Sequence, residues 1–268
     1  MKRTIIFWIL ALLITLGSAV YQRTTGPTYP INGKINLEGR DIKYSLSRSH
    51  GGTTNHTVEI KTDNPAIEGF VIWKRYKTND DWTKVQMVYK DGTLSAELPN
   101  QPPAGKLEYQ VTLQAGDKTF TLPEQAPNII RFKGDVPSLV LIIHVFTMFT
   151  GMLFSNRAAI ESFTKEANLK FLTLSTLVLI AVGGMILGPV VQKYAFDAYW
   201  TGWPFGTDLT DNKTAIAFIA WIFAAISVYK FKNPRRWVIA AAIITLAVYL
   251  IPHSMFGSEL DYSKLPQQ

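Results

Sequence analysis

Apolar and polar positions divide the chain into two kinds of region. Five stretches are dominated by aliphatic and aromatic residues and contain no Asp, Glu, Lys or Arg: residues 4–20, 136–155, 171–191, 214–229 and 237–251. At a rise of about 1.5 Å per residue, runs of about 15 to 21 residues reach about 22 to 32 Å, close to the thickness of the hydrocarbon core of a bilayer. The pattern predicts a transmembrane helix at the N-terminus and a four-helix transmembrane bundle over residues 136–253.

Residues 27–133 show an alternation of apolar and polar positions with a period of two, which is typical of β-strands with one buried face. Turns rich in Gly, Asp, Asn and Pro separate the alternating segments. Strands are expected near residues 34–37, 42–46, 57–61, 69–76, 82–89, 94–98, 107–113, 118–122 and 128–132. Several short strands at this spacing predict an antiparallel β-sandwich between the first and second membrane spans.

Three features within residues 27–133 resemble fibronectin type III and immunoglobulin-like modules. Trp73 lies in an early central strand, FVIWKRY, the run Pro102-Pro103-Ala104-Gly105 turns the chain, and Tyr109 follows in LEYQVTL. The last two are similar to the corner before the penultimate strand of such modules. The resemblance implies a fold and no particular activity, and it does not extend to the membrane half.

Charges in the connecting segments predict the orientation of the spans. Basic residues gather before residue 4, in 156–170 and in 230–236, whereas residues 192–213 and 254–268 are acidic to neutral. Because basic loops stay on the cytoplasmic side, the N-terminus is expected in the cytoplasm, and the β-sandwich and the C-terminal tail in the periplasm of a bacterial inner-membrane protein.

The first span has two interpretations. Gly17, Ser18 and Ala19 offer small residues for signal-peptide cleavage, while the length of the run and its polar end Tyr21-Gln22-Arg23 favour an uncleaved signal-anchor. The predicted organisation is therefore a signal-anchor or signal peptide over residues 1–24, a sandwich over 27–133, a bundle over 136–253 and an outer tail over 254–268.

Composition excludes several classes of protein. The formal net charge of +7 is spread over loops beside membrane spans and forms no single patch, so nucleic-acid binding is not expected. The chain has no cysteine, which excludes disulfides, thiolate metal sites, iron–sulfur clusters and covalently attached c-type haem.

His144 and His253 are the first candidates for cofactor binding. His144 lies about eight residues into the second span and His253 directly after the last one, so both are expected in the outer half of the bundle. Two imidazoles on facing helices can serve as axial ligands of haem b, and Gly184 and Gly188 would let a flat macrocycle approach closely. The alternatives are a helix–helix hydrogen bond for His144 and a packing groove for the glycines.

Carboxylates on the outer side suggest a second kind of site. Asp208, Asp211 and Glu259 could bind a divalent cation together with His253, although Asp208 and Asp211 also lie where acids cap a helix. His50 and His56 flank a predicted loop, where they either bind copper or zinc or face solvent.

The sequence contains no P-loop, dinucleotide fingerprint, nucleophile elbow or HExxH motif. We therefore expect a non-catalytic interaction or assembly protein, embedded in the lipid bilayer, with a membrane or periplasmic protein as partner. A b-type haem electron carrier is the first alternative, and divalent-metal handling is the second.

Overall fold

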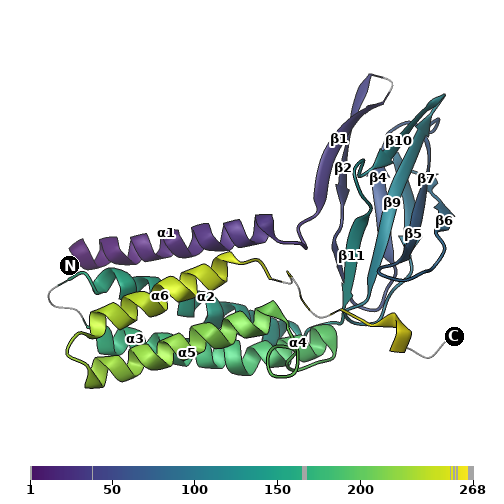
Figure 1. The fold of residues 1–268 in the computed structure, drawn as a ribbon. Helices are drawn as coiled ribbons and strands as arrows, with labels where there is room; N and C mark the ends of the chain where they lie inside the picture. The colour runs from purple at the N-terminus through teal and green to yellow at the C-terminus, as the bar shows by residue number, and fades with distance from the viewer. Residues whose placement is uncertain are drawn as a thin grey trace. The chain divides into compact units, whose positions relative to one another are not determined.

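The computed structural model describes residues 2–37, 39–164, 168–253, 255, 257 and 259–264. The chain forms two compact units (Figure 1). Residues 1–27 and 136–258 make a helical unit, and residues 28–135 and 259–268 make a β unit. The predicted tail over residues 254–268 is thus divided between the two units, and several of its residues lie outside the described ones.

The helical unit contains the predicted apolar segments as helices. Their bounds are α1 Lys2–Thr25, α2 Ser138–Glu161, α3 Leu169–Ile180, the π-helix η1 Ala181–Leu187, α4 Gly188–Phe196, α5 Leu209–Lys230 and α6 Pro234–Leu250. Within the described residues, four helical segments are long and apolar enough to cross a membrane, namely α1, α2, the continuous run α3–η1–α4, and α5. These helices indicate a membrane protein.

The fifth predicted span coincides with α6, which has 17 residues. This length is at the lower end of the range for a transmembrane helix, so α6 as a membrane span stays a prediction. The start of α6 is set by the local sequence, because Pro234 occupies the first turn, where the backbone N–H that proline lacks has no partner within the helix.

Helix α1 packs against α2 and α6 (Figure 1). The Asn156 amide donates to the Thr15 hydroxyl at 3.0 Å. The guanidinium of Arg157 lies 5.3 Å from the ring centroid of Phe7 and 5.4 Å from that of Trp8. Since Asn156 and Arg157 are both buried, α2 continues as a packed helix beyond the predicted end of its span.

The β unit contains eleven strands in its described residues. They are β1 Ile31–Leu37, β2 Arg40–Leu46, β3 Ser49–Gly51, β4 His56–Lys61, β5 Glu68–Arg75, β6 Thr83–Gln86, β7 Val88–Lys90, β8 Thr93–Leu98, β9 Lys106–Ala115, β10 Lys118–Leu122 and β11 Asn128–Lys133. A six-stranded sheet has the order β3-β11-β9-β5-β6 with β10 also paired to β9, a three-stranded sheet has the order β4-β8-β7, and β1 and β2 form a hairpin. All pairs are antiparallel except β3 with β11. This arrangement is compatible with a β-sandwich.

All three sheets contribute to one hydrophobic core. The hairpin supplies Leu37 and Leu46, the three-stranded sheet Ile60 and Leu94, and the six-stranded sheet Val71, among others. The alternation of buried and exposed residues along the strands follows the period read in the sequence.

Two local predictions differ from the structure. The segment predicted as one strand over residues 82–89 is two strands in different sheets, because the chain leaves the six-stranded sheet at Met87. Ser49, His50 and Gly51, which lie outside every predicted strand, form β3, whose parallel pairing with β11 is a long-range contact that local sequence cannot specify.

Candidate functional site

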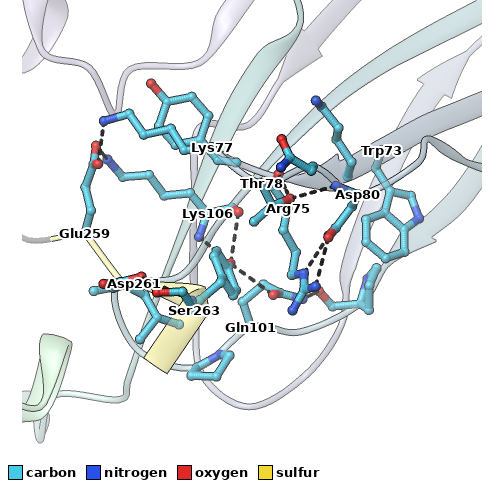
Figure 2. A pocket seen from close by; sticks show the side chains of 18 of the residues that line it. Trp73, Arg75, Lys77, Thr78, Asp80, Gln101, Lys106, Glu259, Asp261 and Ser263 are labelled. Carbon is cyan, nitrogen blue, oxygen red and sulfur yellow. Dashed lines mark hydrogen bonds and ion pairs between the residues drawn. The ribbon is translucent and has the colours of Figure 1, made fainter. Parts of the chain in front are cut away.

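The β unit contains a cleft of about 1430 Å³. Three segments line it: the end of β5 with the loop to β6, the connection between β8 and β9, and residues 259–263 after the last helix (Figure 2). Four cationic side chains of the β strands and their loops lie along it, Lys74, Arg75, Lys77 and Lys106. We call it the basic cleft.

The β5–β6 loop is fixed by a bidentate ion pair. The Nε and Nη2 atoms of Arg75 donate to the two carboxylate oxygens of Asp80 at 2.6 and 2.9 Å. The Thr78 hydroxyl donates to the Arg75 carbonyl at 2.9 Å. A fork of this kind is among the stronger hydrogen-bonded pairs in proteins, so it holds the loop beside the cleft.

Lys77 and Lys106 converge on one carboxylate. Both Nζ atoms lie 2.7 Å from oxygens of Glu259, Lys77 from Oε2 and Lys106 from Oε1 (Figure 2). The two ammonium groups also lie 5.2 and 5.5 Å from the ring centroid of Tyr76. The two ammonium groups therefore form a binding site for one carboxylate, beside the ring of Tyr76.

Tyr262 provides the second anchor of this segment. Its hydroxyl accepts from the backbone N–H of Lys106 at 2.9 Å and lies 3.0 Å from both the Lys106 carbonyl and Oε1 of Gln101, to either of which it can donate. The Arg75 guanidinium lies 5.2 Å from its ring centroid. Burial raises the pKa of Tyr262 to about 12, which keeps the hydroxyl protonated.

The β8–β9 turn is shaped to receive Tyr262. A Cβ atom on Gly105 would lie 3.0 Å from the Tyr262 hydroxyl oxygen and 2.8 Å from the Pro102 carbonyl, so a side chain here would force a displacement. Ala104 has a φ of 68° in the same turn, and its carbonyl accepts from the backbone N–H of Leu260 at 3.3 Å.

The charges in the basic cleft favour an ionised carboxylate. Burial raises the pKa of Glu259, but the hydrogen bonds from Lys106 and Lys77 outweigh this effect, so the pKa lies below its ordinary value. The bond to Glu259 raises the pKa of Lys77. Burial lowers the pKa of Lys106 despite the same bond, because its stem lies deeper in the unit.

His144, the first sequence candidate, lies in the helical unit beside η1. Its Nδ1 atom lies 2.9 Å from the Gly183 carbonyl. In a π-helix the hydrogen bonds connect residues five apart, and Gly183 also accepts from the Gly188 N–H in this pattern. The imidazole therefore connects α2 to η1 through one nitrogen, and its Nε2 is the nitrogen that could bind a ligand.

The candidate glycines lie against side chains of neighbouring helices. A Cβ on Gly184 would lie 2.7 Å from Cγ2 of Thr214 and 3.6 Å from the Met148 sulfur, and one on Gly188 would lie 4.0 Å from Cε1 of His144. The close approach at Gly184 is that of a packing groove between helices, whereas a Cβ at Gly188 would make only an ordinary van der Waals contact.

His253 lies near several charged groups of the same unit. Lys213, His144 and Asp208 are its electrostatic neighbours. Lys213 is buried, and its ammonium donates to the Ile251 carbonyl at 2.6 Å. This bond holds the segment that carries His253 close to the start of α5.

The three candidate metal-binding carboxylates are engaged in other contacts. Asp208 accepts from the Thr210 N–H at 2.7 Å, capping α5, and Asp211 accepts from the N–H groups of Thr201 and Gly202 at 2.6 and 2.9 Å. Glu259 belongs to the β unit. No group of three His, Asp or Glu residues suited to a metal ion occurs in the part of the chain that the structure describes, and divalent-metal binding stays a prediction.

His50 and His56 come together in the β unit. Their ring centroids are 5.1 Å apart, and Nε2 of His50 lies 2.8 Å from the Thr54 carbonyl. Burial, together with the charge of His50, lowers the pKa of His56 to about 4. The pair thus forms a ring contact between β3 and β4.

Acidification is expected to destabilise the β unit through His56. Between about pH 6.5 and 4 the unfolded chain binds a proton at His56 that the folded chain does not. The contribution of His56 to the free energy of unfolding is therefore fully present above pH 6.5 and is lost as the pH falls to 4. The upper bound is about 3 kcal/mol, which solvent screening of a partly buried ring reduces to about 1 to 2 kcal/mol. Unfolding of the wild type and of His56→Gln at pH 7 and pH 4 measures this; an equal loss in both proteins would contradict it.

Sequence reasoning did not identify Lys77, Lys106, Gln101 or Tyr262 as a group. Their spacing along the chain is too large for any local motif, and the clustering of charges in KRYKTNDD and in ELDY was the available signal. Comparisons of the chain with protein-family models, with curated proteins and with solved structures give no match.

Proposed function

We propose that the chain is a non-catalytic binding protein of a bacterial inner membrane, whose β unit binds an acidic partner in the basic cleft on the periplasmic side. The observation that carries this proposal is the placement of one carboxylate 2.7 Å from both Lys77 and Lys106. A site with two ammonium groups beside the ring of Tyr76 is suited to acidic side chains of a partner protein.

An immunoglobulin-like fold for the β unit is part of the proposal. The order β4-β8-β7 corresponds to strands B, E and D of immunoglobulin-like domains, and β11-β9-β5 corresponds to G, F and C. Trp73 lies on β5, the counterpart of the strand that carries the buried Trp in such domains.

The orientation is proposed from the charges of the loops. Arg157, Lys170, Lys230, Arg235 and Arg236 lie in or beside the α2–α3 and α5–α6 connections. With these connections in the cytoplasm, α1 ends and α2 begins at the periplasmic face, so the strands between them along the chain lie in the periplasm.

The test of the cleft uses a fluorescent decaglutamate peptide and the full chain in detergent micelles. We expect binding that weakens with salt and that Lys77→Glu reduces by about tenfold or more, because one of two ammonium groups is replaced by a like charge. Lys118→Glu is the matched control, since Lys118 is exposed on β10 and does not line the cleft. Equal binding by the Lys77→Glu and Lys118→Glu variants would contradict the proposal.

A b-type haem electron carrier is the second candidate. The observation in its favour is the bond between Nδ1 of His144 and the Gly183 carbonyl, because histidines that ligate metals commonly donate their other N–H to such a group. His253, whose electrostatic neighbours include His144, would be the second ligand.

The visible absorption spectrum tests this candidate. If His144 and His253 ligate haem, protein from haem-replete cells has a Soret band that shifts on dithionite reduction, and alanine at either position abolishes it. His50→Ala, in the β unit, is the control and should leave the band unchanged. A featureless spectrum of the wild type ends the hypothesis.

A further inference from the structure

The segment Glu259–Ser263 forms one wall of the basic cleft and lies against its cationic side chains as a bound peptide would (Figure 2). It is far from the cleft's other residues along the chain and is attached through three independent contacts. The Glu259 carboxylate meets Lys77 and Lys106, the Leu260 N–H donates to the Ala104 carbonyl, and the Tyr262 hydroxyl meets the backbone of Lys106. Together these contacts recognise an acid, a backbone N–H and a tyrosine at defined spacing.

The tyrosine contact is specific for a hydroxyl. The Tyr262 oxygen is within hydrogen-bond distance of the Lys106 N–H, the Lys106 carbonyl and Gln101 Oε1. Phenylalanine would fill the same space, with Arg75 still over the ring, but would lose all of these polar contacts. A site built to bond a hydroxyl discriminates strongly against the analogue that lacks it.

The segment is also complementary to the cleft in charge. Apart from residues 259–263, the cleft is lined by Lys74, Arg75, Lys77 and Lys106 but only by Asp80 and Asp81 as acids. The segment adds Glu259 and Asp261. Arg75 is paired with Asp80, and Lys74 is paired with Glu108. Among the described residues, Lys77 and Lys106 form their ion pairs with Glu259.

One of the two ion pairs of the segment is open to solvent, whereas the Lys106 side chain of the other is only 16% exposed. The side chains of Lys77 and Glu259 are 63% and 38% exposed, and ion pairs with such exposure contribute only about 0 to 1 kcal/mol. A short covalent tether compensates for weak contacts, because it holds the segment at an effective concentration on the order of millimolar. A free partner must compete with that concentration.

We propose that the wall of the basic cleft formed by Lys77, Gln101, Ala104 and Lys106 is a recognition site for a partner polypeptide that carries an acidic residue followed three positions later by tyrosine, and that residues 259–262 cover this wall as a tethered competitor. This inference rests on the proposed function and adds to it the sequence chemistry of the partner and its regulation.

The experiment measures binding of a fluorescein-labelled peptide, ELDYSK, to the full chain in detergent by anisotropy. The double variant Glu259→Gln/Tyr262→Phe releases the tethered competitor and is expected to bind the peptide at least tenfold more tightly than the wild type. Adding Lys77→Gln to the double variant should weaken binding again, whereas adding Lys118→Gln should not. The single variant Glu259→Gln, which is isosteric, serves the same comparison if the double variant is poorly folded.

Control peptides separate this inference from the proposed function. ELDFSK and QLDYSK are expected to bind at least tenfold more weakly than ELDYSK. If decaglutamate binds, but ELDFSK equals ELDYSK or the wild type equals the double variant, the acidic-partner function stands and the present inference is overturned. If neither decaglutamate nor ELDYSK binds any variant, both are overturned.

Discussion

Replacement of Arg157 by alanine is expected to destabilise the helical unit by about 3 to 5 kcal/mol, because it leaves a largely buried carboxylate without its cationic partner. Nη1 of Arg157 donates to Glu161, and the side chains are only 6% and 15% exposed. The same guanidinium lies over the rings of Phe7 and Trp8. Its loss therefore removes contacts between α1 and α2 as well as an ion pair.

Thermal unfolding in detergent, followed by circular dichroism, measures this effect. The double variant Arg157→Met/Glu161→Leu is the control, since removal of both charges leaves no unpaired ion and should cost less than the single change. A single variant as stable as the wild type, or a double variant less stable than the single one, would contradict a buried ion pair in which each charge needs the other.

Replacement of Asp211 by alanine is expected to cost about 3 kcal/mol. Its carboxylate accepts from the backbone N–H groups of Thr201 and Gly202 and from the Gln192 amide, and the residue is 6% exposed. Removing it leaves these donors with no charged acceptor in a buried position. One hydrogen bond to a charged group is worth about 1.5 to 3 kcal/mol, and bonds that share one acceptor do not add independently, so we expect a cost at the upper end of this range.

The same thermal measurement, with and without EDTA, separates two roles for this loop. Asp197→Asn is the matched control, because the Asp197 side chain is 77% exposed and pairs with Lys193 at the surface, so its loss should cost less than about 1 kcal/mol. A structural role predicts that Asp211→Ala lowers the melting temperature equally in both buffers. A wild-type protein destabilised by EDTA would instead support metal binding by the outer carboxylates.

Hydrophobic pattern alone determined where the helices and most strands lie. Long runs without charge predicted α1, α2, the run α3–η1–α4 and α5, because a segment that avoids charge over some twenty residues has few alternatives to a buried or membrane helix. Period-two alternation located β1, β2, β4, β5 and β8 to β11 within a few residues, because each of these strands buries one face. The sequence also indicated Asp208 as a helix cap, because a cap contacts only backbone groups a few residues away.

Long-range contacts were decided only by the tertiary structure. The pairing of β3 with β11, the division of residues 82–89 between two sheets, and the π-helix opposite His144 depend on neighbours that are distant in sequence. The basic cleft is the clearest case. Lys77, Lys106 and Glu259 are each unremarkable charges in the sequence, and only the return of residues 259–264 to the β unit, after helices α2 to α6, brings their side chains together. Composition determines which groups are charged, whereas the path of the chain determines which charges meet.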